Sequence, residues 1–202
     1  MKLFAPMSDL TSQQRKISNR VVQFSLGVLA AVGFAMGAPA RANINDMEEH
    51  QRLWNVLQEN GVTLVVNSPA YCGDDVAGLY GSHEKLLFIC QQNAEIPYRE
   101  VEWTAFDLDT LRHEAHHVVQ DCMAGKLGDQ EFGLLFNDAD ELYSFVESGL
   151  SPEQVDMVLS MYEEADDFEL LMELEAFATA NSVDADTIAD GINNVCGATY
   201  DY

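Results

Sequence analysis

Two histidines and a glutamate stand at a spacing that can build a hydrolytic metal site within five residues. Residues 113–117 read His-Glu-Ala-His-His. Residues four apart lie on one face of an α-helix, so the imidazoles of His113 and His117 can bind one tetrahedral ion. Glu114 lies beside them, where its carboxylate can take a proton from a water that the ion activates for attack on a carbonyl carbon. The pattern predicts Zn²⁺ as the cofactor and Glu114 as the catalytic base.

The two histidines leave one ligand position to fill. A catalytic zinc usually has three protein ligands and one open position, and no histidine follows His117. We therefore expect a carboxylate. The segment 164–181 has a helical pattern whose apolar face includes Glu175, and a buried carboxylate is costly unless a metal binds it. Glu175 is the predicted third ligand, and the alternatives left open are Glu173, Asp138 and Asp140.

A helix must position this motif, and the surrounding residues predict one at 104–123. Apolar residues there recur at spacings of three and four, and the segment contains no glycine or proline. The other predicted elements are helix 45–60, strand 62–66, a loop or bulged strand at 71–82, strand 86–90, an irregular segment 125–137, and helices near 138–147, from Ser151-Pro152, at 164–181 and at 184–194. They predict an α+β fold in which a small sheet packs on the active-site helix and is followed by a mostly helical C-terminal half.

The motif, together with Glu175-Ala176 downstream, resembles the zincin metallopeptidases of the glutamate-zincin type, in which a second helix supplies a Glu followed by Ala. The resemblance covers the two helices and, more loosely, strand 86–90, which in zincins would lie antiparallel to an extended substrate. It implies a zincin-like fold and a peptide or protein substrate. One departure is the missing downstream histidine that stabilises the oxyanion in some members, a task left to Tyr143 or Tyr162. We expect His116 to be a surface residue or a neighbour of the ligands.

Residues 1–42 have the features of a cleaved export signal. Basic residues precede an apolar stretch at 21–37, and residues 40–42 read Ala-Arg-Ala, a small-x-small cleavage pattern. We predict cleavage after residue 42, export to the periplasm or out of the cell, and a single metallopeptidase-like domain at 43–202. No stable membrane anchor is expected after cleavage, and the alternative is an uncleaved N-terminal anchor.

The chain is strongly acidic. Five of the ten basic residues and one of the 34 acidic residues precede residue 43, so the remaining 160 residues carry 5 basic against 33 acidic side chains, a formal charge of −28. The electrostatic field of such a negative charge repels nucleic acid and anionic membranes. It excludes nucleic acid as an expected partner and leaves open whether the acidity serves solubility in salt or attracts cationic substrates.

All four cysteines lie after the predicted signal. An even number of cysteines in an exported protein indicates disulfide bonds. The favoured reading is two disulfides, Cys72 with Cys90 and Cys122 with Cys196. A cysteine-rich zinc site is disfavoured because no Cys-x-x-Cys spacing occurs.

These features together predict a secreted zinc-dependent metallopeptidase. The alternatives are a secreted zinc-binding protein without turnover and an acidic, disulfide-stapled interaction module without metal. Against the first alternative stands Glu114, which has no role in a purely structural metal site.

Overall fold

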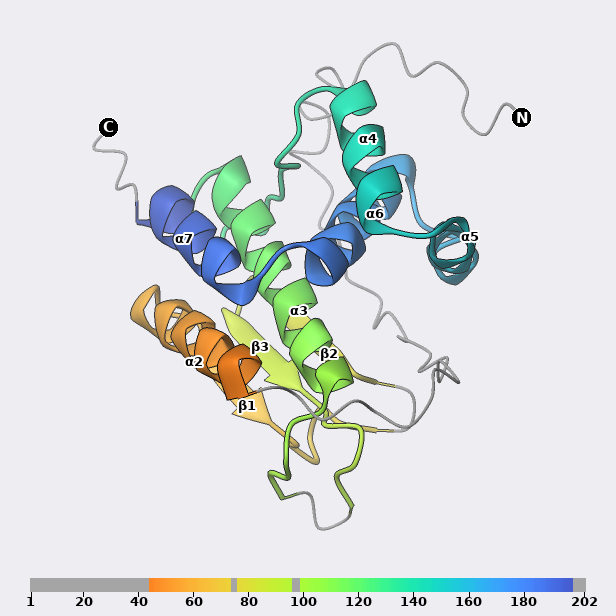
Figure 1. Ribbon diagram of the computed structural model, residues 1–202. Coiled ribbons are helices and arrows are strands. Elements are labelled where there is room, and N and C mark those ends of the chain that lie inside the picture. The colour runs from red at the N-terminus through yellow and green to blue at the C-terminus, as the bar shows by residue number, and fades with distance from the viewer. Residues whose placement is uncertain (1–43, 74–75, 96–98, 198–202) are drawn as a thin grey trace.

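The computed structural model describes residues 44–73, 76–95 and 99–197, which form a small sheet flanked by two helices, with the remaining helices beyond them (Figure 1). In chain order the elements are α2 (Ile44–Glu59), β1 (Thr63–Val66), β2 (Gly78–Gly81), β3 (Leu86–Ile89), α3 (Ala105–Ala124), α4 (Ala139–Gly149), α5 (Pro152–Met161), α6 (Asp167–Ser182) and α7 (Ala185–Cys196). This order confirms the α+β class, with the strands in the N-terminal half and a mostly helical C-terminal half.

The sheet has the strand order β1-β3-β2. β3 pairs with β1 in parallel and with β2 antiparallel. The strand expected at 86–90 is therefore central, and the expectation that its backbone would face an extended substrate is wrong. An edge of the sheet belongs to β2, which lies within the segment 71–82 that was predicted to be a loop or a bulged strand. Two of its four residues are glycines, which are depleted in strands, so the sequence did not decide between a loop and a strand.

α3 runs through the centre of the fold, where it packs against the sheet, α6 and α7 (Figure 1). Its start is determined locally. The Thr104 side chain accepts a hydrogen bond from the backbone of Asp107, and the Asp107 carboxylate accepts one from the backbone of Thr104. This capping box satisfies amide groups that the first turn of a helix leaves unpaired. The histidine motif thus lies on a helix whose middle is buried between other elements.

Two apolar clusters hold the helices in place. One joins α2, α3, α7 and the sheet, and the other joins α4, α5 and α6. α6 contacts α3 as well as α4 and α5. Because neighbours lie on several sides of it, ten of the 16 residues of α6 are buried, including two glutamates.

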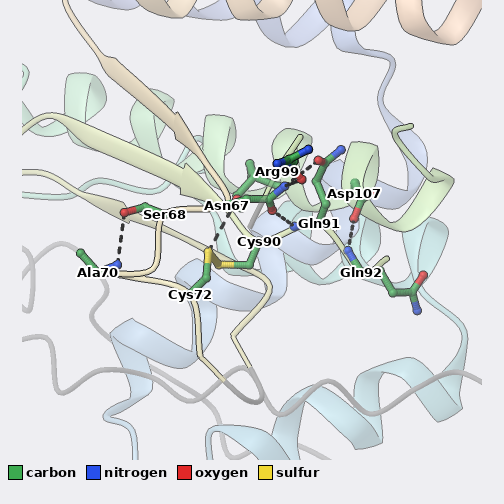
Figure 2. The surroundings of a disulfide bond; sticks show 10 residues. Asn67, Ser68, Ala70, Cys72, Cys90, Gln91, Gln92, Arg99 and Asp107 are labelled. Carbon is green, nitrogen blue, oxygen red and sulfur yellow. Dashed lines mark hydrogen bonds between the residues drawn. A yellow bond between two sulfur atoms is a disulfide. The ribbon is translucent and has the colours of Figure 1, made fainter. Parts of the chain in front are cut away.

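The ends of the strands are tied to the start of α3 beside the first disulfide, as Figure 2 shows. The Asn67 amide donates to Gln91 Oε1 at 2.8 Å and to the carbonyl oxygen of Arg99 at 2.9 Å, and its Oδ1 accepts from the Gln91 backbone at 2.8 Å. The backbone N–H of Gln92 then donates to Asp107 Oδ1 at 2.8 Å, in the first turn of α3. These bonds set the position of the motif relative to the sheet.

The two disulfides have the predicted pairings, Cys72 with Cys90 and Cys122 with Cys196. Disulfides are typical of oxidising, exported environments. The predicted export signal at 1–42 lies outside the described residues. Within the part of the chain that the structure describes, no helix has the length and apolar character needed to cross a membrane.

Candidate metal centre

Three side chains converge into a group that could hold a metal ion. His113 and His117 come from α3 and Glu173 comes from α6, and one potential ligand atom of each lies within 4.8 Å of the others. His117 Nε2 is 3.1 Å from His113 Nε2. Glu173 Oε2 is 3.3 Å from His113 Nε2, and Glu173 Oε1 is 3.5 Å from His117 Nε2. The two histidines are brought together as their helical spacing predicts.

The carboxylate in this group is Glu173, one of the open alternatives, and not the favoured Glu175. Glu175 is fully buried, but hydrogen bonds occupy both of its oxygens. Its partners are His116 Nε2 at 3.0 Å, Gln120 Nε2 at 2.8 Å, and the backbone N–H groups of Leu135 at 2.9 Å and Phe136 at 3.3 Å. The preference for Glu175 assumed that α6 buries a single face. Since α6 is enclosed on several sides, residues two apart point in different directions and are both buried.

The aspartate alternatives lie elsewhere. Asp138 is the N-cap of α4, where its side chain accepts hydrogen bonds from the backbone of Asp140 and Glu141. Asp138 and Asp140 are exposed, and neither joins the histidine group.

The donor set fits a metal ion. Among the buried side-chain nitrogen and oxygen atoms of the described residues, Glu173 Oε2 is one of three that have no hydrogen bond. A buried ionised oxygen in this situation is costly unless a cation neutralises it. Two imidazole nitrogens and one carboxylate oxygen are ligands that divalent transition metals accept.

The two carboxyls beside this group differ in acidity. Burial raises the pKa of Glu114 to about 7, although His117 and a hydrogen bond from the Tyr80 backbone oppose the increase. Burial also acts to raise the pKa of Glu173, but the imidazoles of His117 and His113 outweigh it and lower that pKa to about 2. Glu173 is thus suited to bind a cation, and Glu114 is suited to exchange a proton near neutral pH.

β2 lies directly against the histidine motif because Gly78 has no side chain. A Cβ at Gly78 would lie 2.7 Å from Thr110 Cγ2 and 3.2 Å from Glu114 Cγ, both on α3. A larger residue would therefore push the strand away from the helix. The sequence offered only a weak signal for this contact, a glycine within a segment predicted to be a loop or a bulged strand.

Of the two tyrosines expected to replace the missing histidine, Tyr162 lies at the group. Its hydroxyl hydrogen-bonds to Glu173, and burial together with the charge of Glu173 raises the pKa of its phenol. The pKa of Tyr143 is raised by burial and by Asp167 and Asp140 instead.

Polar residues next to the motif are buried and paired. His116 is buried, and its contact is with Glu175, so it is a neighbour of the ligands and not a surface residue. Burial lowers the pKa of His116. Gln120 is also fully buried and contacts His117. The sequence did not single it out as functional, although a polar residue three positions after a ligand on a buried helix is a usable signal.

The comparisons with known proteins add no relative: no family model, curated protein or solved structure matches this chain. Its function is therefore inferred from the residues of the site and from their geometry.

Proposed function

We propose that this protein is an exported zinc-dependent metallopeptidase of zincin type, in which His113, His117 and Glu173 hold the ion and Glu114 is the catalytic base. The observation that carries the proposal is the convergence of two histidines and a glutamate on one point, next to Glu114. The carboxyl of Glu114 follows the first ligand on α3, is buried, and has a pKa raised by burial to about 7. Such a carboxyl can both accept and return a proton at neutral pH.

The reaction would be hydrolysis of a peptide bond. When bound, zinc would polarise the substrate carbonyl and lower the pKa of a coordinated water. Glu114 would accept the proton released as water attacks the carbonyl carbon and would return it to the leaving nitrogen. The hydroxyl of Tyr162 has one proton, which it donates to Glu173, so Tyr162 would have to turn away from Glu173 before it could donate to the oxygen on which negative charge develops.

An extended peptide substrate is supported by β2. This strand is at the end of the sheet order, so one of its edges carries backbone groups that an extended chain can pair with. The backbone of Tyr80 in β2 hydrogen-bonds to Glu114, so the edge strand lies next to the proposed base. The substrate-pairing role that the resemblance implied for strand 86–90 would thus pass to β2.

The metal site is tested by measuring zinc per chain in the purified protein beside His117→Ala and His83→Ala. His83 is exposed and lies outside the group, so it is the matched control. We expect about one zinc in the parent and in the control, and little in His117→Ala, as the loss of one of three ligands would cause. If the folded parent protein contains no zinc although it was never exposed to a chelator, the metal site is ruled out.

A zinc-binding protein without turnover is the second candidate. It is favoured by the burial of His113 and Glu173, because an ion there would join α3 to α6. A Glu114→Gln variant separates the two. If the protein is a peptidase, the variant keeps zinc and loses hydrolysis of a mixed peptide library. Zinc in a parent that cleaves no member of the library would favour the second candidate, and a parent without zinc would favour the acidic, disulfide-stapled module.

A further inference from the structure

We propose that Gln120 is a positioning residue that holds His117 in the ring orientation and tautomer that a metal ion requires. This inference deepens the proposed metal site and rests on it for its function. Gln120 lies on α3, three residues after His117, and is fully buried. Its Oε1 lies 2.7 Å from His117 Nδ1. A ligand histidine usually makes such a contact through the ring nitrogen that faces away from the metal.

The orientation of the Gln120 amide follows from its other contacts. Its Nε2 donates to the carbonyl oxygen of Met172 at 3.1 Å and to Glu175 Oε2 at 2.8 Å. The reversed amide would bring its oxygen against these two oxygens, without a hydrogen between them. Only the amide oxygen can therefore face the imidazole. An amide oxygen accepts and never donates, so His117 Nδ1 must carry the proton.

This tautomer leaves the other ring nitrogen free. With the proton on Nδ1, His117 Nε2 has a lone pair, and it lies 3.1 Å from His113 Nε2 and 3.5 Å from Glu173 Oε1. A metal ion binds only a ring nitrogen that carries no proton. Gln120 thus selects the form of His117 that can bind before any ion arrives. His113 offers a contrast, since its Nδ1 has no hydrogen-bond partner and its tautomer is not determined in this way.

Glu175 holds Gln120 in place. Its carboxylate receives hydrogen bonds from α3, through Gln120 and His116, and from the backbone of Leu135 and Phe136 in the preceding segment. The backbone N–H of Gly133 also donates to the backbone carbonyl oxygen of Gln120 at 2.8 Å. A fully satisfied buried network of this kind is rigid. It gives the buried Glu175 a role that does not require contact with the ion.

The tautomer can be read directly in metal-free protein. In protein labelled with ¹⁵N-histidine and kept with a chelator, long-range ¹H–¹⁵N spectra distinguish a proton on Nδ1 from one on Nε2, and His117→Ala assigns the resonance. We expect Nδ1–H in the parent and a mixture of tautomers in Gln120→Leu. Zinc affinity, measured by competition with a chromophoric chelator, should fall about 10–100-fold in this variant.

Two further variants separate positioning from stability. Gln120→Glu keeps an oxygen that accepts from His117 Nδ1 but places its second oxygen against Met172 O and Glu175 Oε2, so the folded variant should retain the parent tautomer although its free energy of unfolding falls. Gln92→Leu changes an exposed glutamine side chain and should match the parent in both measurements.

A parent spectrum with the His117 proton on Nε2 would overturn the inference, whether or not any variant folds. Gln120→Leu protein that keeps both the Nδ1–H form and the parent zinc affinity would overturn it as well. A parent that binds no zinc would refute the proposed function, while the tautomer of His117 would still decide the role of Gln120.

Discussion

Replacing Glu114 by glutamine should stabilise the metal-free protein at neutral pH. In the zinc-loaded protein the same change should abolish hydrolysis. The carboxyl is 2% exposed, and burial raises its pKa from 4.5 to about 7. The folded protein therefore holds the proton more tightly than the unfolded chain does. As pH rises through this interval, the unfolded state loses its proton first, and the free energy of unfolding of the parent falls.

The size of the effect follows from the two pKa values. Each pH unit between the unfolded and the folded pKa corresponds to about 1.4 kcal/mol, so a rise from 4.5 to about 7 amounts to about 3 kcal/mol at pH 7 and above. Glutamine has nearly the same shape, carries no charge, and can still accept the hydrogen bond from the Tyr80 backbone. Glu114→Gln should therefore lack this loss of stability.

The assay is urea unfolding followed by circular dichroism between about pH 4.5 and pH 8, in the presence of a chelator. Glu147→Gln is the control because Glu147 is exposed on α4, and it should change stability by less than about 0.5 kcal/mol. If Glu114→Gln and the parent lose stability in parallel as pH rises, Glu114 is not desolvated and the reasoning that makes it a base near neutral pH is refuted.

Three further changes test the packing around the site. Glu175→Gln should lower the free energy of unfolding by about 1–3 kcal/mol, because a buried hydrogen-bond acceptor is lost, yet folded protein should keep its zinc; loss of zinc from folded variant would show that Glu175 is a ligand. Gly78→Ala should cost about 1–3 kcal/mol in urea unfolding and reduce turnover, since the new Cβ would lie 3.2 Å from Glu114 Cγ; unchanged turnover would contradict the close approach of β2. Replacing Cys122 and Cys196 by serine opens a loop of 74 residues and should cost about 4 kcal/mol, seen as a lower Tm by calorimetry; an unchanged Tm would mean that this crosslink does not restrict the unfolded chain.

Sequence alone determined the features that depend on neighbours along the chain. The pairing of His113 with His117 follows from the pitch of a helix, and the helix itself follows from its apolar spacing. The start of α5 was predicted from Ser151 and Pro152, because a cap and a proline at the first helical position act locally. The four cysteines predicted two disulfides, and the favoured pairings are the observed ones.

The tertiary structure decided the features that depend on which surfaces meet. Glu173 and Glu175 are two positions apart on the same helix, and both are buried because α6 has neighbours on several sides. No pattern along the chain could therefore show which carboxylate faces the histidines and which one binds His116 and Gln120. The sequence left β2 undecided between a loop and a bulged strand for a related reason. The glycines of β2 weaken every local signal for a strand, and Gly78 is suited to its position only because α3 packs against it at that point.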